Sequence, residues 1–319
     1  MSETESAMTA AARSLLSSLP ADSREDACFP FASPARTQWS YLPGQRQGIA
    51  LSELGIAGRK AAHRLLATAL SRPAFTQAVT IMAFEEVLDL DERGQLGRRS
   101  DGYHVAVFGS PGDDRWAWRF EGHHLSVRVT VTVGRPLVGP LFLGANPAQV
   151  RDHDGRVVAA PLLREEDLAR ALVAGLPPAL REQAVISATA PRDIITTTAA
   201  TAGLLAPPGF LASQLPGEAR GQLSQLVGIY LGRLASELAE AEHHRVATAD
   251  LTFAWAGRLN AGQGHYYRIQ APGLLIEYDN TQRSANHAHT VLRRPGEDFG
   301  ASPLARHLAT EHPRSEVAD

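Results

Sequence analysis

The sequence predicts an α+β fold: an antiparallel or mixed sheet formed from two strand-rich blocks, with a helical N-terminal part and a helical middle segment. The strand-like stretches fall in two blocks, residues 103–133 and 251–293, on either side of the helical middle. Helices and strands therefore do not alternate regularly, as they would in a βαβ protein. The composition, with 44% hydrophobic and 20% charged residues, is typical of a globular domain. We expect the two blocks to share one sheet.

The N-terminal part is predicted to contain three helices and a long connection. Residues 6–18 fit an amphipathic helix that ends before Pro20. Residues 20–48 are rich in proline, glycine and polar residues, and we expect them to wrap over the surface. Two further helices are predicted at 57–70 and 74–90, with Pro73 in the first turn of the second helix.

The first strand block shows the clearest alternation in the chain. A strand is predicted at 103–109, and the segment SPGDD that follows has the chemistry of a turn. Residues 116–121 and 125–133 then alternate apolar and polar side chains, which predicts a sheet with one buried face.

The middle and the second strand block complete the fold. Helices are predicted at 165–176, 178–186 and 218–242. Strands are predicted at 251–256, 265–270, 274–279 and 288–293, the middle two joined by the tight turn Ala-Pro-Gly. No internal repeat is apparent. We expect a helix and surface wrap at 1–38, a single domain at 39–311 (possible subdomains 39–160 and 161–311) and a frayed tail at 312–319.

Five of the twelve histidines, all in the two strand blocks, are the candidate metal ligands: His123, His124, His265, His287 and His289. His287 and His289 are two residues apart on a predicted strand, so both rings leave the same face and can chelate one ion. Gly122 suggests a bulge that redirects the rings of His123 and His124, one of which we expect to face the site. Hydrogen-bonded histidines at the rim of the sheet are the alternative.

Carboxylates are predicted beside these histidines. Glu277 and Asp279 share one face of their strand and are candidate metal ligands or general bases. Arg268 on the neighbouring strand is a candidate to orient an anionic group of the substrate, although a simple ion pair with the carboxylates is an equal alternative. The single cysteine, Cys28, excludes a cysteine-based zinc cluster.

Several long segments resemble a bacterial family catalogued as domain of unknown function 3500. The resemblance runs from about Trp39 to His307, and these are the segments that carry it: WAWRFEGHHLSV, PLFLGANPA, FAWAG, HYYRIQAPGLLIEYDNTQRSANHAHTV and DFG. It implies membership of a widespread type of soluble protein whose chemistry has not been assigned.

These observations favour a metal-dependent enzyme that holds Zn, Fe, Cu or Mn, most simply a hydrolase acting on a small polar or anionic substrate. An iron- or copper-dependent oxidoreductase uses the same ligand types. A metal-free acid/base enzyme and a non-catalytic small-molecule-binding protein, with a pocket lined by Trp255, Tyr266 and Tyr267, are further alternatives.

Charge and hydropathy argue against two classes of binding partner, nucleic acids and membranes. The formal net charge of −3 and the lack of basic runs argue against nucleic acid. No stretch of the sequence is apolar enough for a membrane span, and the N-terminal residues lack the pattern of a secretory signal. We therefore expect a cytoplasmic protein without a membrane partner, and the oligomeric state stays open.

Overall fold

The computed structural model describes residues 2–301 of the 319-residue chain, and this part is an α+β protein, as predicted. The predicted tail at 312–319 lies outside the described residues. The helices are α1 (Glu3–Ser17), α2 (Ala21–Ala27), α3 (Ile56–Ala69), α4 (Arg72–Asp91), α5 (Leu163–Gly175), α6 (Pro178–Ala184), α7 (Gly217–Leu231) and α8 (Ser236–Val246). No helix between residues 2 and 301 is long and apolar enough to span a membrane.

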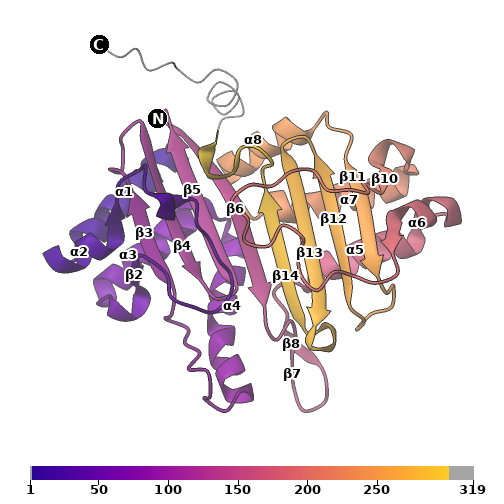
Figure 1. The fold of residues 1–319 in the computed structure, drawn as a ribbon, viewed down its shortest axis with the longest axis horizontal. Helices are drawn as coiled ribbons and strands as arrows, with labels where there is room; N and C mark the ends of the chain where they lie inside the picture. Colours follow the sequence, from indigo (N-terminus) through magenta and orange to yellow (C-terminus); the bar gives the residue numbers. More distant parts are fainter. Residues whose placement is uncertain (1, 302–319) are drawn as a thin grey trace, which may run out of the picture.

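A mixed sheet, mostly antiparallel, dominates the molecule (Figure 1). Its central order is β3-β4-β5-β6-β14-β13-β12-β11, so the two strand blocks do form one sheet. They meet where β6 pairs antiparallel with β14, with Leu143 opposite Thr290. The strands are β1 (Cys28–Phe29), β2 (Ile49–Ala50), β3 (His104–Phe108), β4 (Arg115–Gly122), β5 (Leu125–Thr132), β6 (Arg135–Ala145), β7 (Val150–Arg151), β8 (Val157–Ala159), β9 (Val185–Ser187), β10 (Phe210–Leu211), β11 (Thr252–Gly257), β12 (His265–Ala271), β13 (Leu274–Gln282) and β14 (His287–Arg293). Strands β7 and β8 form a separate hairpin.

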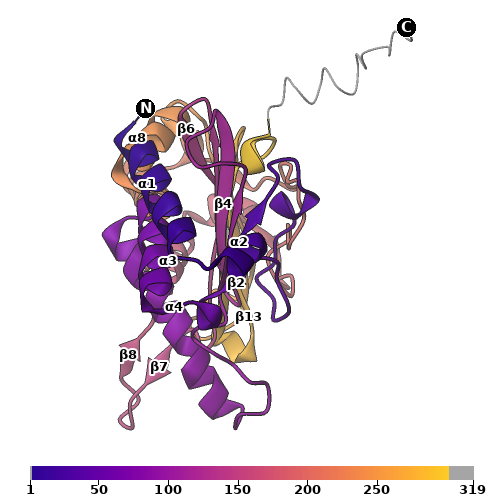
Figure 2. The same cartoon turned by 90° about the vertical axis from the view of Figure 1, so that its left-hand side faces the viewer.

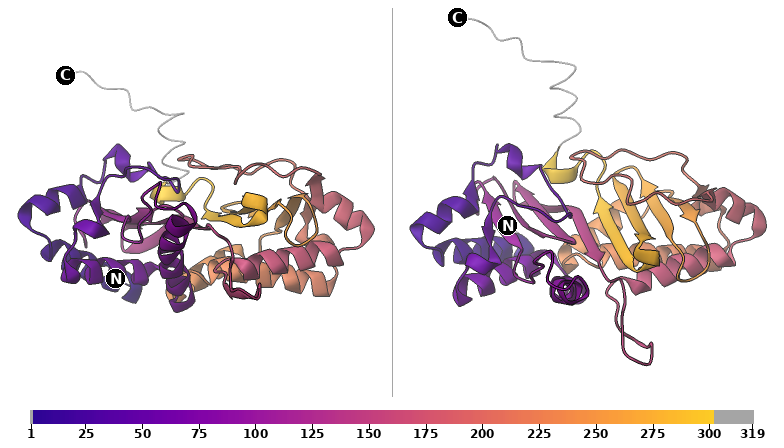
Figure 3. Two further views of the ribbon diagram at one scale, coloured as in Figure 1. Left: turned by 90° about the horizontal axis from the view of Figure 1, so that it is seen from below. Right: turned by 60° about the horizontal axis from the view of Figure 1, so that its bottom comes forward.

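The sheet is covered on both faces, contrary to the prediction of one buried face. Most of the helices pack on one face, and two long irregular segments cross the other (Figures 2 and 3). We call these segments the first strap (residues 30–48) and the second strap (residues 188–208). Because the first strap lies over β5, the polar side chains Ser126, Arg128 and Thr130 are buried instead of solvated.

Polar side chains of the sheet hold both straps through backbone groups. Arg119 donates to the carbonyl oxygens of Ala35 and Gln38 in the first strap. Gln270 holds the second strap, where its amide group both accepts from and donates to the backbone of Leu205. Such contacts satisfy backbone groups that would otherwise be buried without partners.

The chain consists of two halves with the same topology, which overturns the expectation that there is no internal repeat. In the first half, β1 runs parallel and β2 antiparallel to β3; in the second half, β9 runs parallel and β10 antiparallel to β11. Each half places two helices before these short strands, two helices after them, and then a four-stranded meander. The halves meet at the β6–β14 pair, and Figure 1 shows them as two similar wings about this junction.

The sequence retains traces of this duplication at matching structural positions. LPADSREDA (19–27) corresponds to LPPALREQA (176–184), and GIALSEL (48–54) corresponds to GFLASQL (209–215). A Cβ atom on Gly48 would lie 2.6 Å from Val105 O, and one on Gly209 would lie 2.7 Å from Phe253 C, so both halves need glycine at the same close approach. Arg59 and Arg220, five residues after the motif, each donate to the carbonyl oxygen of the leucine that ends it.

Two predicted segments differ from the structure, and one long strand was not predicted. The helix predicted at 218–242 is divided into α7 and α8, because the chain between them forms a bridge from Leu234 to Leu70 of the other half. Residues 20–48 are not only a surface wrap, since they include α2 and β1. Strand β6 was not predicted, because Pro136, Gly139 and Pro140 interrupt its apolar pattern.

Candidate metal centre

Three histidine side chains converge at one end of the β6–β14 junction. The Nε2 atom of His287 lies 2.9 Å from Nε2 of His124 and 2.9 Å from Nε2 of His289. One nitrogen atom from each ring belongs to a set whose members all lie within 4.8 Å of one another. Nitrogen ligands of a tetrahedral ion at about 2.05 Å would be about 3.3 Å apart, so small movements would fit this triad around an ion.

The triad joins the two halves of the molecule. His124 lies in the two-residue turn between β4 and β5 of the first half, and His287 and His289 lie on β14 of the second half. The alternation of a strand places the two β14 rings on one face, as predicted. The turn is fixed against the junction because the carbonyl oxygen of His124 accepts from the backbone N–H of Gly144 on β6.

The contact of His289 with Asp193 implies that its lone pair faces the centre. Nδ1 of His289 lies 2.7 Å from Oδ1 of Asp193, and since a carboxylate only accepts, this nitrogen carries the proton and Nε2 keeps its lone pair. Burial lowers the pKa of His287 to about 3, and it also lowers the pKa of His124 well below its ordinary value. Neutral imidazoles with converging lone pairs repel one another unless a proton or a cation lies between them.

Asp193, in the second strap, forms the outer support of this centre. Besides binding His289, it accepts a hydrogen bond of 2.9 Å from the hydroxyl of Tyr41 in the first strap. Burial opposes its ionisation, but the hydrogen bonds and the proximity of His289 outweigh burial and lower the pKa of Asp193. A carboxylate behind a ligating histidine is a common arrangement in metal sites, where it fixes the tautomer and the orientation of the ring.

Glu85 supports the turn from the helix layer. Its Oε1 atom lies 2.7 Å from Nδ1 of His123 and 3.9 Å from Nδ1 of His124, and the two imidazole rings are tilted by 31° with their centroids 3.7 Å apart. His123 therefore points away from the triad toward α4, and His124 is the member of the pair that joins it. Gly122 does not form a bulge but pairs regularly with Leu125.

Backbone strain is concentrated around the triad. Of the eight non-glycine residues with positive φ in the described chain, four are His124 (φ 60°) and the run Arg283, Ser284 and Ala285 (φ 49°, 55° and 65°). This run forms η4 (Arg283–Ala285), immediately before β14. Left-handed conformations cost L-residues roughly 1–2 kcal/mol each. Strain of this kind tends to collect at functional sites, where the surrounding structure holds it.

The structure separates His265 from the triad. Its ring stacks on Trp255 with a centroid distance of 4.3 Å and lies near Tyr278, whose hydroxyl donates to Glu166 of α5. It therefore faces the helix layer, whereas His289 contacts Tyr41 on the opposite, strap-covered face. His265 is buried, and its Nδ1 atom lies 3.0 Å from a nitrogen of the Arg170 guanidinium.

Glu277 and Arg268 lie on the strap-covered face but contact the second strap instead of the triad. Both carboxylate oxygens of Glu277 accept hydrogen bonds, from the backbone of Ile195 and Thr196 and from the hydroxyl of Tyr266. Arg268 donates to the carbonyl oxygen of Pro207, and the alternative ion pair with Glu277 is not among the ion pairs of the described residues. In the repeat, Arg268 occupies the position of Arg119, and Glu277 occupies the position of Arg128. Arg119 and Arg128 hold the first strap.

Asp279 lies nearer to the centre, opposite His289 in the β13–β14 pair. Its Oδ1 atom accepts from the backbone and hydroxyl of Thr281, and its buried Oδ2 atom has no hydrogen-bond partner among the described residues. Burial, together with the neighbouring carboxylates of Asp193 and Glu277, raises the pKa of Asp279 to about 7.

The other end of the β6–β14 junction has different chemistry. There Glu242 of α8 forms ion pairs with Arg245 and Arg294, at 2.5 and 2.7 Å, and Arg245 also donates to Gly273 in the β12–β13 turn. Gly273 occupies the position that matches His124 of the first half. Ion pairs of Glu242 and a hydrogen bond from Arg245 to the turn thus replace the histidines. The described part of the chain therefore retains one histidine triad instead of two.

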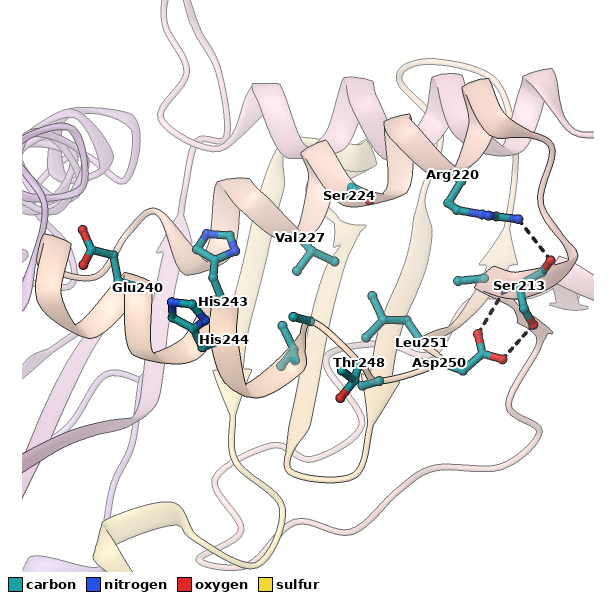
Figure 4. A pocket seen from close by; sticks show the side chains of 14 residues that line it. Ser213, Arg220, Ser224, Val227, Glu240, His243, His244, Thr248, Asp250 and Leu251 are labelled. Carbon is teal, nitrogen blue, oxygen red and sulfur yellow. Dashed lines mark hydrogen bonds between the residues drawn. The ribbon is translucent and has the colours of Figure 1, made fainter.

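A larger open groove lies elsewhere, between α7, α8 and the start of β11 (Figure 4). His243 and His244 line it beside Val227 and Leu251, and Asp250 accepts hydrogen bonds from Ser213 at its far end. Among residues 2–301, groups of three or more side chains placed to share one ion occur only around His124. The groove therefore does not compete with the triad as a metal centre.

Comparison with known proteins identifies the family. The chain belongs to the family described as "Protein of unknown function (DUF3500)", whose sequence profile matches residues 1–301. The match includes α1 and α2, which precede the part on which the resemblance in the sequence rests. The searches of curated proteins and of solved structures give no match.

Proposed function

We propose that this protein is a metal-dependent enzyme in which His124, His287 and His289 hold one divalent ion. The observation that carries the proposal is the convergence of three Nε2 atoms within reach of a single ion, with a carboxylate behind His289. Three neutral nitrogen ligands leave at least one position of a tetrahedral ion for water or substrate, as in catalytic zinc sites. His287 is partly exposed, which gives the centre access to solvent.

Hydrolysis of a small polar or anionic substrate is the simplest activity for such a centre. A divalent ion bound to three imidazoles supplies hydroxide near neutral pH. The roles of the protein are then to position the ion, through Asp193 and the strained turns, and to admit the substrate. An iron- or copper-dependent oxidoreductase would use the same three histidines. The identity of the bound metal separates these two activities.

A binding function without metal has less support. The three aromatic side chains proposed to line a ligand pocket, Trp255, Tyr266 and Tyr267, are completely buried between the sheet and its covering layers. They offer no surface to a ligand in this conformation, so no feature of the described chain favours that alternative.

Elemental analysis of tag-free protein, purified without chelator, tests the proposal. We expect about one equivalent of Zn, Fe, Cu or Mn per chain, retained by wild type and lost from His287→Ala and His289→Ala. His243→Ala, in the groove of Figure 4, is the matched control and should keep the metal. If wild-type protein binds no ion even after reconstitution, or if the triad variants keep a full equivalent, the proposal fails.

A further inference from the structure

Two arginines flank the triad and share one carboxylate. Nε of Arg98, in the connection after α4, lies 2.9 Å from Oε2 of Glu92, and Nη2 of Arg283, in η4, lies 3.3 Å from Oε1 of the same side chain. Arg98 follows the helix that carries Glu85, and Arg283 stands four residues before His287. Both segments that support the triad therefore present a guanidinium at its rim.

The charges at this rim do not balance. Arg99 shares Asp101 with Arg59, and Arg46 shares Glu121 with Arg128. Arg98 and Arg283 have only Glu92 between them. Once Glu85 beside His123 is counted, these six arginines face four carboxylates, which leaves two positive charges in excess before any metal binds. A divalent ion on three neutral imidazoles would add two more. Clustered positive charge beside a hollow attracts small anions.

A small hollow opens on this rim. It has a volume of about 180 Å³ and is lined in part by Arg46, Glu85, Arg98, Arg99 and His123. Arg283 does not line it but is linked to Arg98 through Glu92. Since one water molecule takes up about 30 Å³, the hollow has room for about six water-sized groups. This matches a small carboxylate or a phosphate group with a short substituent, and it is too small for a nucleotide.

We propose that the substrate carries an oxyanion, a carboxylate or a phosphate, and that Arg98 and Arg283 bind it at the rim of the metal centre. Without substrate, the carboxylate of Glu92 accepts hydrogen bonds from both guanidiniums. The substrate anion displaces this carboxylate and accepts the same hydrogen bonds. Planar guanidiniums suit this role because their N–H groups match the oxygens of carboxylate and phosphate. The strained backbone at Arg283 has a function in this arrangement, since it fixes the guanidinium and His287 together. The inference rests on the proposed function, because it identifies the class of substrate for that centre.

Calorimetric titration with inorganic phosphate and with acetate, at constant ionic strength, tests the inference. The full chain is titrated in the metal-free state and after loading with one equivalent of Zn²⁺. We expect Arg98→Gln and Arg283→Gln each to weaken anion binding about 10-fold or more, as loss of a charged hydrogen bond does. Glu92→Gln should tighten binding severalfold, because it removes the competing carboxylate. Arg64→Gln, at an exposed arginine of α3, is the control and should have no effect.

The outcomes separate this inference from the proposed function. Arginine-dependent binding in the metal-free chain supports the rim site even if metal analysis of the same sample finds no bound ion. A preference for phosphate over acetate, or the reverse, identifies the oxyanion. The inference is overturned if neither anion binds at millimolar concentration, or if binding is unchanged in both arginine variants. A Glu92→Gln variant with weaker binding would also count against it, since that result would give Glu92 a structural role only.

Discussion

Replacement of Asp193 by asparagine should weaken metal binding without unfolding the protein. The carboxylate lies 2.7 Å from Nδ1 of His289 and holds the proton on that nitrogen. If the asparagine amide oxygen faces His289, the negative charge is lost; if the amide nitrogen faces it, the proton must move to Nε2 and block the metal-binding atom. Loss of such a partner usually costs 10–100-fold in metal affinity, or about 1.4–2.7 kcal/mol.

Competition with a chromophoric zinc chelator would measure this loss at pH 7.5. Tyr41→Phe is the matched control, because it removes the hydroxyl that donates to Asp193 but leaves the carboxylate in place. It should reduce the affinity by a smaller factor. Equal affinities for wild type and Asp193→Asn, in protein with unchanged circular dichroism, would refute the reasoning that Asp193 sets the tautomer of a metal ligand.

Three further predictions concern the surroundings of the centre. The pKa of Asp279 is raised from 3.8 to about 7 in the folded state. Between these pH values the folded chain retains a proton that the unfolded chain has released. The free energy of unfolding should therefore fall as pH rises from 3.8 to about 7, by about 4 kcal/mol at most. Asp279→Asn should remove most of this slope in urea unfolding at pH 4, 5.5 and 7.5, and an unchanged slope would contradict the assignment. His265→Ala should keep the metal but lower the free energy of unfolding by about 2–4 kcal/mol, because it leaves a cavity in the helix-facing core; metal loss would place the ring at the centre after all. Gly122→Ala should cost about 1–3 kcal/mol by chemical denaturation, because its Cβ would lie 2.7 Å from Cγ of Tyr103, whereas Gly228→Ala, with open space around it, should cost nothing.

The sequence predicted the elements whose patterns are local. The alternation in β4 and β5 and the Ala-Pro-Gly turn of the β12–β13 hairpin identify the strands correctly, because side-chain period and turn chemistry act over a few residues. It was harder to predict which faces of the sheet are buried. Ser126 and Arg128 have the sequence of a solvated face, and only a strap from a distant part of the chain covers them.

The histidines on β14 were correctly paired by the same local rule, but most of their surroundings were not predictable in this way. His265 is in phase with Tyr267 and Ile269, which places it on the helix-facing side of the sheet, and this pattern could have separated it from His287. Glu85 also left a signal, as an acidic residue in the buried stripe of α4. Asp193 left none, since it stands in an irregular strap whose path depends on the whole fold.

The sequence did not predict the duplication, because the repeated motifs are short and are separated by different numbers of residues. LP-x-x-x-RE-x-A recurs after 157 residues, and the glycine motif recurs after 161 residues, since loops of different length separate them. No single period therefore aligns the two halves. Structural positions such as the close approach of Gly48 and Gly209 reveal the repeat where residue identity alone does not.

The position of the triad across the two halves has a consequence for how the protein assembles. His124 and His287 are 163 residues apart, and the β6–β14 contact that brings them together joins Leu143 to Thr290 across 147 residues. Contacts this distant in sequence form late in folding, because closing so long a loop costs entropy before any contact compensates for it. A half that has folded but not docked offers at most two of the three imidazoles, so it binds the ion weakly. The ion would thus bind tightly only after docking, and by mass action it would hold the docked state together.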